Sequence, residues 1–197
     1  MSKLEIEIPT DWTDVTLGQY VNIAKIKREE GKAAELNYLI ELILILCPTL
    51  TRDILEDIST EDLGKIIGDW TWLSKLPRND KIKKEYIIDK DKYVYAKETD
   101  KLTVGEMVTY ETLVESEQMT QNDTLSLVLA IILRKEVDGV VEDFNTDEIY
   151  NRMRLFENNI SIGDAIGLIF FFSTGGKTST SYLEDCLNQM EELKKTM

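Results

Sequence analysis

A short sequence pattern occurs twice in this chain, and it constrains the fold more than any other feature. Residues 15–26 read VTLGQYVNIAKI, and residues 102–113 read LTVGEMVTYETL. Both contain an aliphatic residue, threonine, a second aliphatic residue, glycine, and then glutamine or glutamate. A threonine followed three residues later by Gln or Glu is a capping box, which satisfies backbone amides at a helix start. The pattern therefore predicts two helices with matching N-termini, capped by Thr16 and Thr103.

The similarity continues beyond these two helices. At the same offset, the apolar run at 38–47 aligns with 125–134, and after a one-residue deletion 56–67 aligns with 142–153. The sequence therefore predicts a tandem repeat, each copy having a strand, a helix, an apolar helix and a further helix with an acidic start. The expected fold class is mainly α-helical with small β elements, a short strand and a hairpin.

Two segments are expected to supply the β elements. Residues 4–9, LEIEIP, alternate apolar and charged side chains, which is typical of a short strand. Residues 84–96, KEYIIDKDKYVYA, predict a hairpin that turns between Asp89 and Asp91. A calcium loop at this turn would need glycine where Val94 stands, so calcium binding is not expected.

The two repeat units are expected to meet near residue 78. LPRNDK, residues 76–81, combines proline with Asn-Asp, a combination typical of a loop between structural units. We expect residues 1–78 to form the first repeat unit, and residues 79–197 the second unit with a C-terminal helical extension. Within the second unit, residues 161–173 predict a capped apolar helix.

Gly18 and Gly105 fall in the first turn of the two predicted helices, where glycine lowers helix stability. One explanation is the close approach of another backbone, and the other is simple tolerance of glycine near a helix end. The sequence favours neither explanation.

Composition excludes several classes of protein. Of the 197 residues, 43% are hydrophobic, which is ordinary for a globular chain with a core. The net charge of −14 argues against nucleic acid as a partner, because phosphate binding depends on clustered Lys and Arg. The longest apolar runs are shorter than the roughly 20 residues that span a bilayer. The N-terminus has no apolar signal segment. We therefore expect a soluble protein with no membrane and no nucleic-acid partner.

Residues suited to catalysis are scarce. The chain has no histidine, the commonest general base and metal ligand. Cys47 and Cys186 lie in apolar stretches with no ligand spacing, which favours buried free thiols. GGKTS at 175–179 is similar to the end of a phosphate-binding loop, but Phe171 stands where its first glycine belongs. We expect no catalytic residues, no metal and no cofactor.

Apolar groups near the end of each predicted unit are candidates for protein–protein contact. Three consecutive phenylalanines cannot all point to one side of a helix, so at least one should meet something outside the local core. The last helix carries an apolar stripe suited to pairing with another helix or to folding back on its own unit. Core packing is the alternative for the aromatic rings. The interaction candidates are Trp70, Trp72, Phe170, Phe171, Phe172, Leu183, Met190 and Leu193.

Three segments carry a resemblance to a known group of proteins. They are IPTDWTDVTLGQYVNI at 8–23, KYVYAKETDKLTVGEMVTYETL at 92–113 and SIGDAIGLIFFFS at 161–173. Together they resemble small acidic proteins from the virion morphogenesis modules of tailed bacteriophages, particularly phages of Bacteroides-like hosts. The resemblance implies a structural or assembly protein and brings no catalytic residues with it.

The resulting hypothesis is a bacteriophage virion structural or assembly protein that acts through protein–protein contacts. A component of the head–tail or tail region, or a cargo protein, is the first form of it, and a tail assembly chaperone absent from the virion is the alternative. A host-directed regulator or enzyme is an alternative of another class. The expected partners are other phage structural proteins, with a homo-oligomer as a further option, and the expected location is the virion or the host cytoplasm.

Overall fold

The computed structural model describes residues 7–27, 30–68, 70–75, 83–95, 102–116 and 123–175, with side chains described as far as Leu168. Its α-helices are α1 (Leu17–Lys25), α2 (Lys32–Leu46), α3 (Arg52–Asp57), α4 (Thr60–Gly68), α5 (Val104–Val114), α6 (Thr124–Ile132), α7 (Ile149–Asn159) and α8 (Ile162–Gly175). Its 3-10 helices are η1 (Trp70–Ser74) and η3 (Thr146–Glu148). Its strands are β1 (Glu85–Ile88), β2 (Asp91–Tyr95), β3 (Leu133–Val137) and β4 (Val140–Val141). The predicted fold class, mainly α-helical with small β elements, is confirmed.

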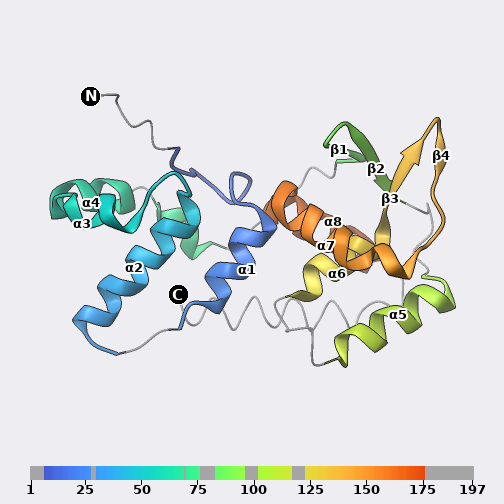
Figure 1. Ribbon diagram of the computed structural model, residues 1–197, viewed down its shortest axis with the longest axis horizontal. Coiled ribbons are helices and arrows are strands. Elements are labelled where there is room, and N and C mark those ends of the chain that lie inside the picture. Colours follow the sequence, from blue (N-terminus) through green and yellow to red (C-terminus); the bar gives the residue numbers. More distant parts are fainter. Residues whose placement is uncertain are drawn as a thin grey trace.

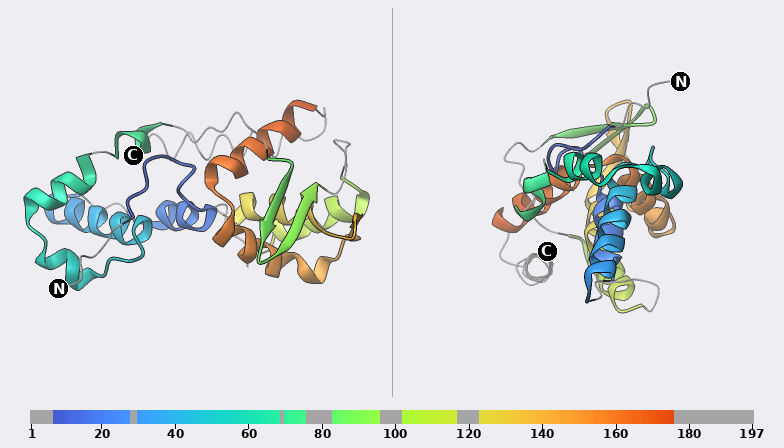
Figure 2. Two further views of the ribbon diagram at one scale, coloured as in Figure 1. Left: turned by 90° about the horizontal axis from the view of Figure 1, so that it is seen from above. Right: turned by 90° about the vertical axis from the view of Figure 1, so that its left-hand side faces the viewer.

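The molecule is elongated, and α1 lies between its two ends (Figure 1). One end is built from α2, α3 and α4, and the other from α5 to α8 with the small sheet. Figure 2 shows β1 and β2 lying over the helices of this second end. Helix α1 packs on α2 in one direction and on α7 and α8 in the other, so it connects the two ends.

The sheet has four antiparallel strands in the order β1-β2-β3-β4. The predicted hairpin at 84–96 is confirmed as β1 and β2. Its two turn residues are Asp89 and Lys90, which have positive φ angles of 51° and 73°. Two positive φ angles in a two-residue turn match the right-handed twist of the strands. Strand β3 follows α6 without a loop, because Leu133 comes directly after Ile132.

The inner face of the sheet packs on α7. Tyr86, Ile88 and Tyr93 are buried on this face. The ring of Tyr93 meets the ring of Phe156 edge to face, with centroids 5.3 Å apart. Aromatic rings favour this geometry because the positive ring edge approaches the negative ring face.

Both predicted capping boxes are present. At α1, Gln19 N donates to Thr16 Oγ1 at 3.2 Å, and Thr16 N donates to Gln19 Oε1 at 2.9 Å. At α5, Glu106 N donates to Thr103 Oγ1 at 3.3 Å, and Thr103 N donates to Glu106 Oε2 at 2.5 Å. Each box satisfies amide groups that have no partner within the helix.

Other helix starts follow the same chemistry. Ser59 Oγ accepts a hydrogen bond from Asp62 N at 3.1 Å before α4, and Ser161 Oγ accepts one from Asp164 N at 3.1 Å before α8. Asn145 caps η3 and not a long helix, because its Oδ1 accepts a hydrogen bond from Asp147 N at 3.0 Å. Helix α7 begins only after this short 3-10 segment.

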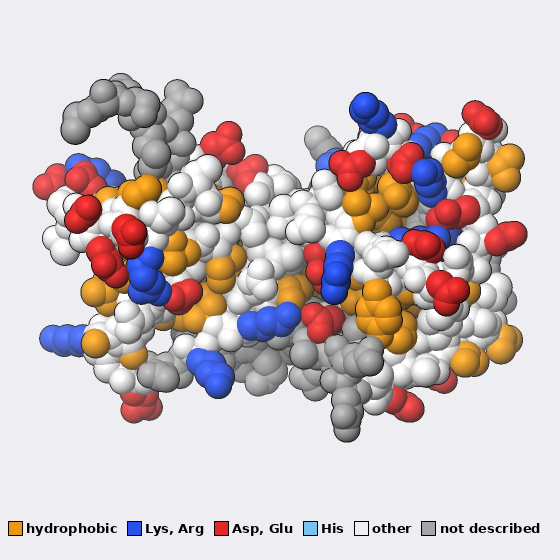
Figure 3. All heavy atoms as spheres, viewed as in Figure 1, with side chains coloured by type: hydrophobic (Ala, Val, Ile, Leu, Met, Phe, Trp, Pro, Cys, Tyr) orange, Lys and Arg blue, Asp and Glu red, His pale blue; other side chains and the backbone are white. Residues whose placement is uncertain are grey.

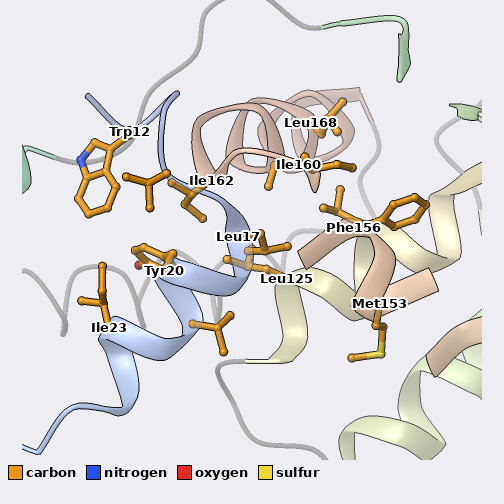
Figure 4. Packing of buried hydrophobic residues seen from close by; sticks show 14 of the residues in the cluster. Trp12, Leu17, Tyr20, Ile23, Leu125, Met153, Phe156, Ile160, Ile162 and Leu168 are labelled. Carbon is orange, nitrogen blue, oxygen red and sulfur yellow. The ribbon is translucent and has the colours of Figure 1, made fainter. Parts of the chain in front are cut away.

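One hydrophobic core cluster runs from Trp12 to Leu168 and includes residues of α1, α2, α6, α7 and α8. Figure 4 shows Leu17 of α1 directed toward side chains from α6, α7 and α8, with Tyr20 on the same helix and Trp12 next to Tyr20. Leu17, Phe156 and Ile162 are completely buried. The α1–α8 junction is also joined through the backbone, since Leu17 N donates to Ile160 O at 2.8 Å and Ile162 N donates to Val15 O at 2.9 Å.

The tandem repeat is not confirmed. The pairs α1–α2 and α5–α6 both pack together, as the alignment predicts. After them the two halves differ: α2 is followed by Pro48 and then by α3, whose cap is Thr51, whereas α6 runs directly into the β3–β4 hairpin. Proline cannot pair in a strand ladder, and Asp138-Gly139 forms a hairpin turn. Of the strand predicted at 4–9, residues 4–6 lie outside the described residues, and residues 7–9 are not in a strand.

The boundary between the two predicted units, 1–78 and 79–197, stays a prediction. Two contacts made by residues of the first unit are relevant to this boundary: one lies within that unit, and the other joins it to the second unit. Trp12 Nε1 donates to Lys75 O at 2.7 Å, which joins the chain before α1 to the chain after η1. Helix α1 packs along α7 of the second unit.

Candidate interaction surfaces

The two tryptophans proposed as contact residues are buried within the chain. Trp70 is 4% exposed and Trp72 is 7% exposed. The ring of Trp72 lies edge to face against Trp12, with centroids 5.0 Å apart. Both rings are therefore packed in the core, which is the alternative that the sequence allowed for them. Neither indole is presented on the surface of this chain.

The remaining predicted contact residues cannot be placed in the same way. Phe170, Phe171 and Phe172 lie on the C-terminal half of α8, beyond the last described side chain. Leu183, Met190 and Leu193 lie outside the described residues. Whether these candidates lie near the two tryptophans is therefore outside the described part of the structure.

Exposed apolar side chains instead lie on the outer side of α5. Leu102, Val104 and Val108 are 39%, 82% and 54% exposed, and Gly105 lies between the two valines. We call these four residues the α5 face. Positions 104 and 108 are one helical turn apart and lie on the same side of the helix. Solvent exposure of two β-branched apolar residues on one side of a helix is unfavourable unless a partner covers them.

A second exposed apolar pair lies at the tip of the β3–β4 hairpin. Val137 and Val140 are 54% and 70% exposed and face each other across the Asp138-Gly139 turn. We call these two valines the hairpin tip. Figure 3 shows apolar side chains at the same end of the molecule over both the hairpin and α5. Most of the large exposed apolar side chains among the described residues therefore lie at the end farthest from α2, α3 and α4, although Leu36 of α2 is also exposed.

A buried ion pair lies beneath the α5 face. Glu106 Oε1 accepts a hydrogen bond from Arg134 Nη2 at 2.5 Å, and both side chains are less than 5% exposed. The guanidinium of Arg134 also lies 4.8 Å from the ring centre of Phe144. Burial lowers the pKa of Arg134, and the adjacent Glu106 carboxylate opposes that change. The ion pair joins α5 to β3, and the carboxylate of Glu106 neutralises the buried charge of Arg134.

A second ion pair joins α7 to the sheet. Arg152 Nη2 lies 2.6 Å from Glu142 Oε1, and Glu142 also accepts a hydrogen bond from Lys135 N at 3.0 Å. The Arg152 side chain is 7% exposed, and its Nη1 atom has no hydrogen-bond partner among the described residues. Two arginines and two glutamates thus neutralise one another within this end of the molecule.

A third polar cluster holds β1 and β2 against the start of α8. Lys83 Nζ lies 2.6 Å from the buried Oδ2 of Asp164. Burial, with a smaller contribution from the Asp164 charge, raises the pKa of both Tyr86 and Tyr95. Both phenols therefore stay protonated at neutral pH. The Tyr86 hydroxyl is buried and has no hydrogen-bond partner among the described residues.

Among the described residues, no group of three His, Cys, Asp or Glu side chains is arranged to hold a metal ion. In the same part of the chain, no helix is both long enough and apolar enough to cross a bilayer.

The sequence alone does not reveal the α5 face. Val104 and Val108 have the helical spacing that is typical of the core-facing side of a helix. The structure instead buries Glu106, Thr109 and Tyr110. The polar residue of the capping box and its partner Arg134 mark the buried side of α5.

Comparison of this chain with protein-family models, with curated proteins and with solved structures found no match.

Proposed function

We propose that this protein is a structural or assembly protein of a tailed bacteriophage virion and that it acts through contacts with other phage proteins. The observation that carries the proposal is the exposed apolar surface at one end of an acidic chain. Val104 and Val140 are 82% and 70% exposed, while nearby buried charges are paired with one another. Binding of a partner protein that covers such a surface is favourable, because it removes apolar side chains from water.

The sequence resemblance sets the biological context of the proposal. The segments at 8–23 and 161–173, which carry part of it, are adjacent in the fold, since Thr16 and Ser161 form a β-bridge. Residues on both sides of this bridge contribute to the core. The resembling segments therefore build one structural junction, which is a reason for them to occur together in a set of related proteins.

Quantitative mass spectrometry of purified particles of the phage that encodes this chain tests the proposal. A virion component is expected at a constant copy number per particle through successive density gradients. Presence in infected cells together with absence from particles would assign the chain to the chaperone alternative. Normal particle yield and infectivity after deletion of the gene would contradict both forms of the proposal.

A further inference from the structure

A third, related copy of the capping pattern lies at the start of α8. Residues 160–164 read ISIGD, and the first two copies read VTLGQ at 15–19 and LTVGE at 102–106. All three have an aliphatic residue on each side of the capping residue and glycine two residues after it. In all three, the capping side chain accepts a hydrogen bond from the amide three residues later. We call these five-residue segments the first, second and third motifs, in chain order.

The first and third motifs pair with each other reciprocally. Their two capping residues lie opposite each other in an antiparallel bridge. Leu17 N donates to Ile160 O at 2.8 Å. In return, Ile162 N donates to Val15 O at 2.9 Å. Each motif therefore gives one N–H and one C=O from the same two positions, and all four aliphatic residues at these positions are at most 1% exposed.

The glycines of these two motifs make matching contacts. A Cβ atom placed on Gly18 would lie 3.0 Å from the backbone oxygen of Glu157, four residues before the capping residue of the third motif. A Cβ atom placed on Gly163 would lie 3.6 Å from the backbone oxygen of Trp12, four residues before the capping residue of the first motif. Glycine thus leaves room for the chain that leads into the other motif. The pattern is therefore self-complementary, because two copies of it contact each other through the same groups.

The second motif has the same local structure but an open surface. Its capping residue, Thr103, has φ and ψ angles of −67° and 163°, and those of Thr16 are −70° and 156°. Leu102 and Val104 are 39% and 82% exposed, whereas the corresponding residues of the other two motifs are buried. A Cβ atom placed on Gly105 would meet no described atom within 4 Å. The second motif therefore has the backbone conformation for pairing, and its aliphatic residues are not covered.

We propose that the second motif pairs with the second motif of another copy of this chain, as the first motif pairs with the third. In this dimer Thr103 lies opposite its counterpart, and each Val104 N donates to the Leu102 O of the other copy. A contact between two identical segments is isologous, so the same residues serve both sides and the assembly closes as a dimer. Gly105 then allows the other chain to come close. This inference rests on the proposed function, in which the chain works through protein–protein contacts.

The bridge within the chain is the reason for choosing a second copy as the partner. It shows that the groups which cover a motif of this kind are those of another such motif. Helix α5 also lies at the end of the molecule away from α2, α3 and α4 (Figure 1). The net charge of −14 on each copy opposes self-association, but salt screens repulsion between separated charges. We therefore expect a reversible dimer with a small interface, which becomes stronger as the salt concentration rises.

Analytical ultracentrifugation of the full-length chain at high salt tests the inference. Val104 is the first residue of α5, where proline is tolerated and removes only the backbone donor. The extended backbone of Thr103 also suits a following proline. Val104→Pro should keep the helix by circular dichroism and weaken the dimer about tenfold, because two hydrogen bonds are lost per dimer.

Gly105→Ala is a second variant whose two effects have opposite directions. Alanine favours the helix and has open space within the chain, so the monomer should be more stable in urea. The added methyl group should nevertheless weaken the dimer, because it blocks the close approach of the other chain. Val140→Ser is the matched control, since it changes an exposed valine at the hairpin tip and should leave the dimer unchanged.

Cross-linking tests the register of the pairing. In a Cys186→Ser background, Thr103→Cys should form a disulfide between two copies on oxidation, because opposed residues of an antiparallel bridge lie within disulfide distance. Val140→Cys in the same background should cross-link much more slowly.

A chain that stays monomeric at every protein and salt concentration would overturn the inference and leave the second motif to a different protein. A dimer that is unchanged by Val104→Pro would also overturn it. If Val104→Pro loses helix, Gly105→Ala gives the decision, and a dimer of undiminished strength in that variant counts against the pairing. Particle composition is measured separately, so failure here leaves the proposed function standing.

Discussion

The carboxylate of Glu106 and the guanidinium of Arg134 form a buried ion pair that ties the start of α5 to the strand that follows α6. The first half of the chain has a neutral counterpart. Gln19, the matching residue of the other capping box, donates from Nε2 to Ile45 O near the end of α2 at 2.8 Å. In both halves the third residue of the capped helix therefore closes its own cap and also contacts a later element, which is α2 for Gln19 and β3 for Glu106.

Removing one member of the ion pair should be much more costly than removing both. Glu106→Ala leaves a buried arginine unpaired, and we expect a loss of about 3–5 kcal/mol in the free energy of unfolding. The double variant Glu106→Leu/Arg134→Met should recover most of that loss, because neither charge is then buried. Urea denaturation measures both variants. Equal stability of Glu106→Ala and the wild type would contradict the pairing.

The two caps should contribute similar amounts to stability. Thr16→Ala and Thr103→Ala each remove the side-chain acceptor of a capping box, and each should lower the free energy of unfolding by about 1 kcal/mol. Serine at either position keeps the acceptor and is the control. Thermal denaturation compares the four variants, and an alanine variant as stable as its serine control would refute the cap at that helix.

The β1–β2 turn should be improved by glycine. Lys90 has a φ angle of 73°, which a residue with a Cβ adopts at a cost. The β3–β4 turn has the same form and already carries Gly139 at its second position. We expect Lys90→Gly to raise the free energy of unfolding by about 1 kcal/mol. Gly139→Lys is the reciprocal variant and should be destabilising; a loss of stability in Lys90→Gly would show that the lysine side chain has a role.

The thiol of Cys47 should be unreactive in the folded protein. It is completely buried, and burial raises its pKa from 9.0 to about 11. At pH 8 only about one molecule in a thousand then carries the reactive thiolate. In a Cys186→Ser background, labelling with a thiol reagent should be at least about 100-fold slower than in urea. Rapid labelling of the native protein would mean that the site opens easily.

The same shift predicts a pH dependence of stability. The folded state holds the Cys47 proton more tightly than the unfolded state, because the folded pKa is the higher one. The stabilising contribution is therefore complete below about pH 9 and declines as the pH rises toward about 11. Cys47→Ala should show a flatter decline over this range in urea titrations. Parallel pH profiles for the two proteins would contradict the raised pKa.

Features that depend on a few neighbouring residues could be predicted from the sequence. The caps at Thr16 and Thr103 form because donor and acceptor are three residues apart, and the hairpin at 84–96 forms because alternating strands flank a short polar turn. The burial of Cys47 follows from the apolar run around it. In each case the interacting groups lie close together along the chain.

Features that depend on which elements become neighbours could not be predicted in this way. Nothing near Arg134 in the sequence identifies Glu106 as its partner. The sequence also allows both a core and a contact role for Trp70 and Trp72, and only the tertiary structure places Trp12 against Trp72. Leu17 and Val104 are the clearest case, because they occupy the same position of the same motif. One is buried and the other exposed, since α7 packs against α1 and no described element packs against the outer side of α5. A motif specifies the helix and its cap, whereas burial is set by contacts between segments far apart in the chain.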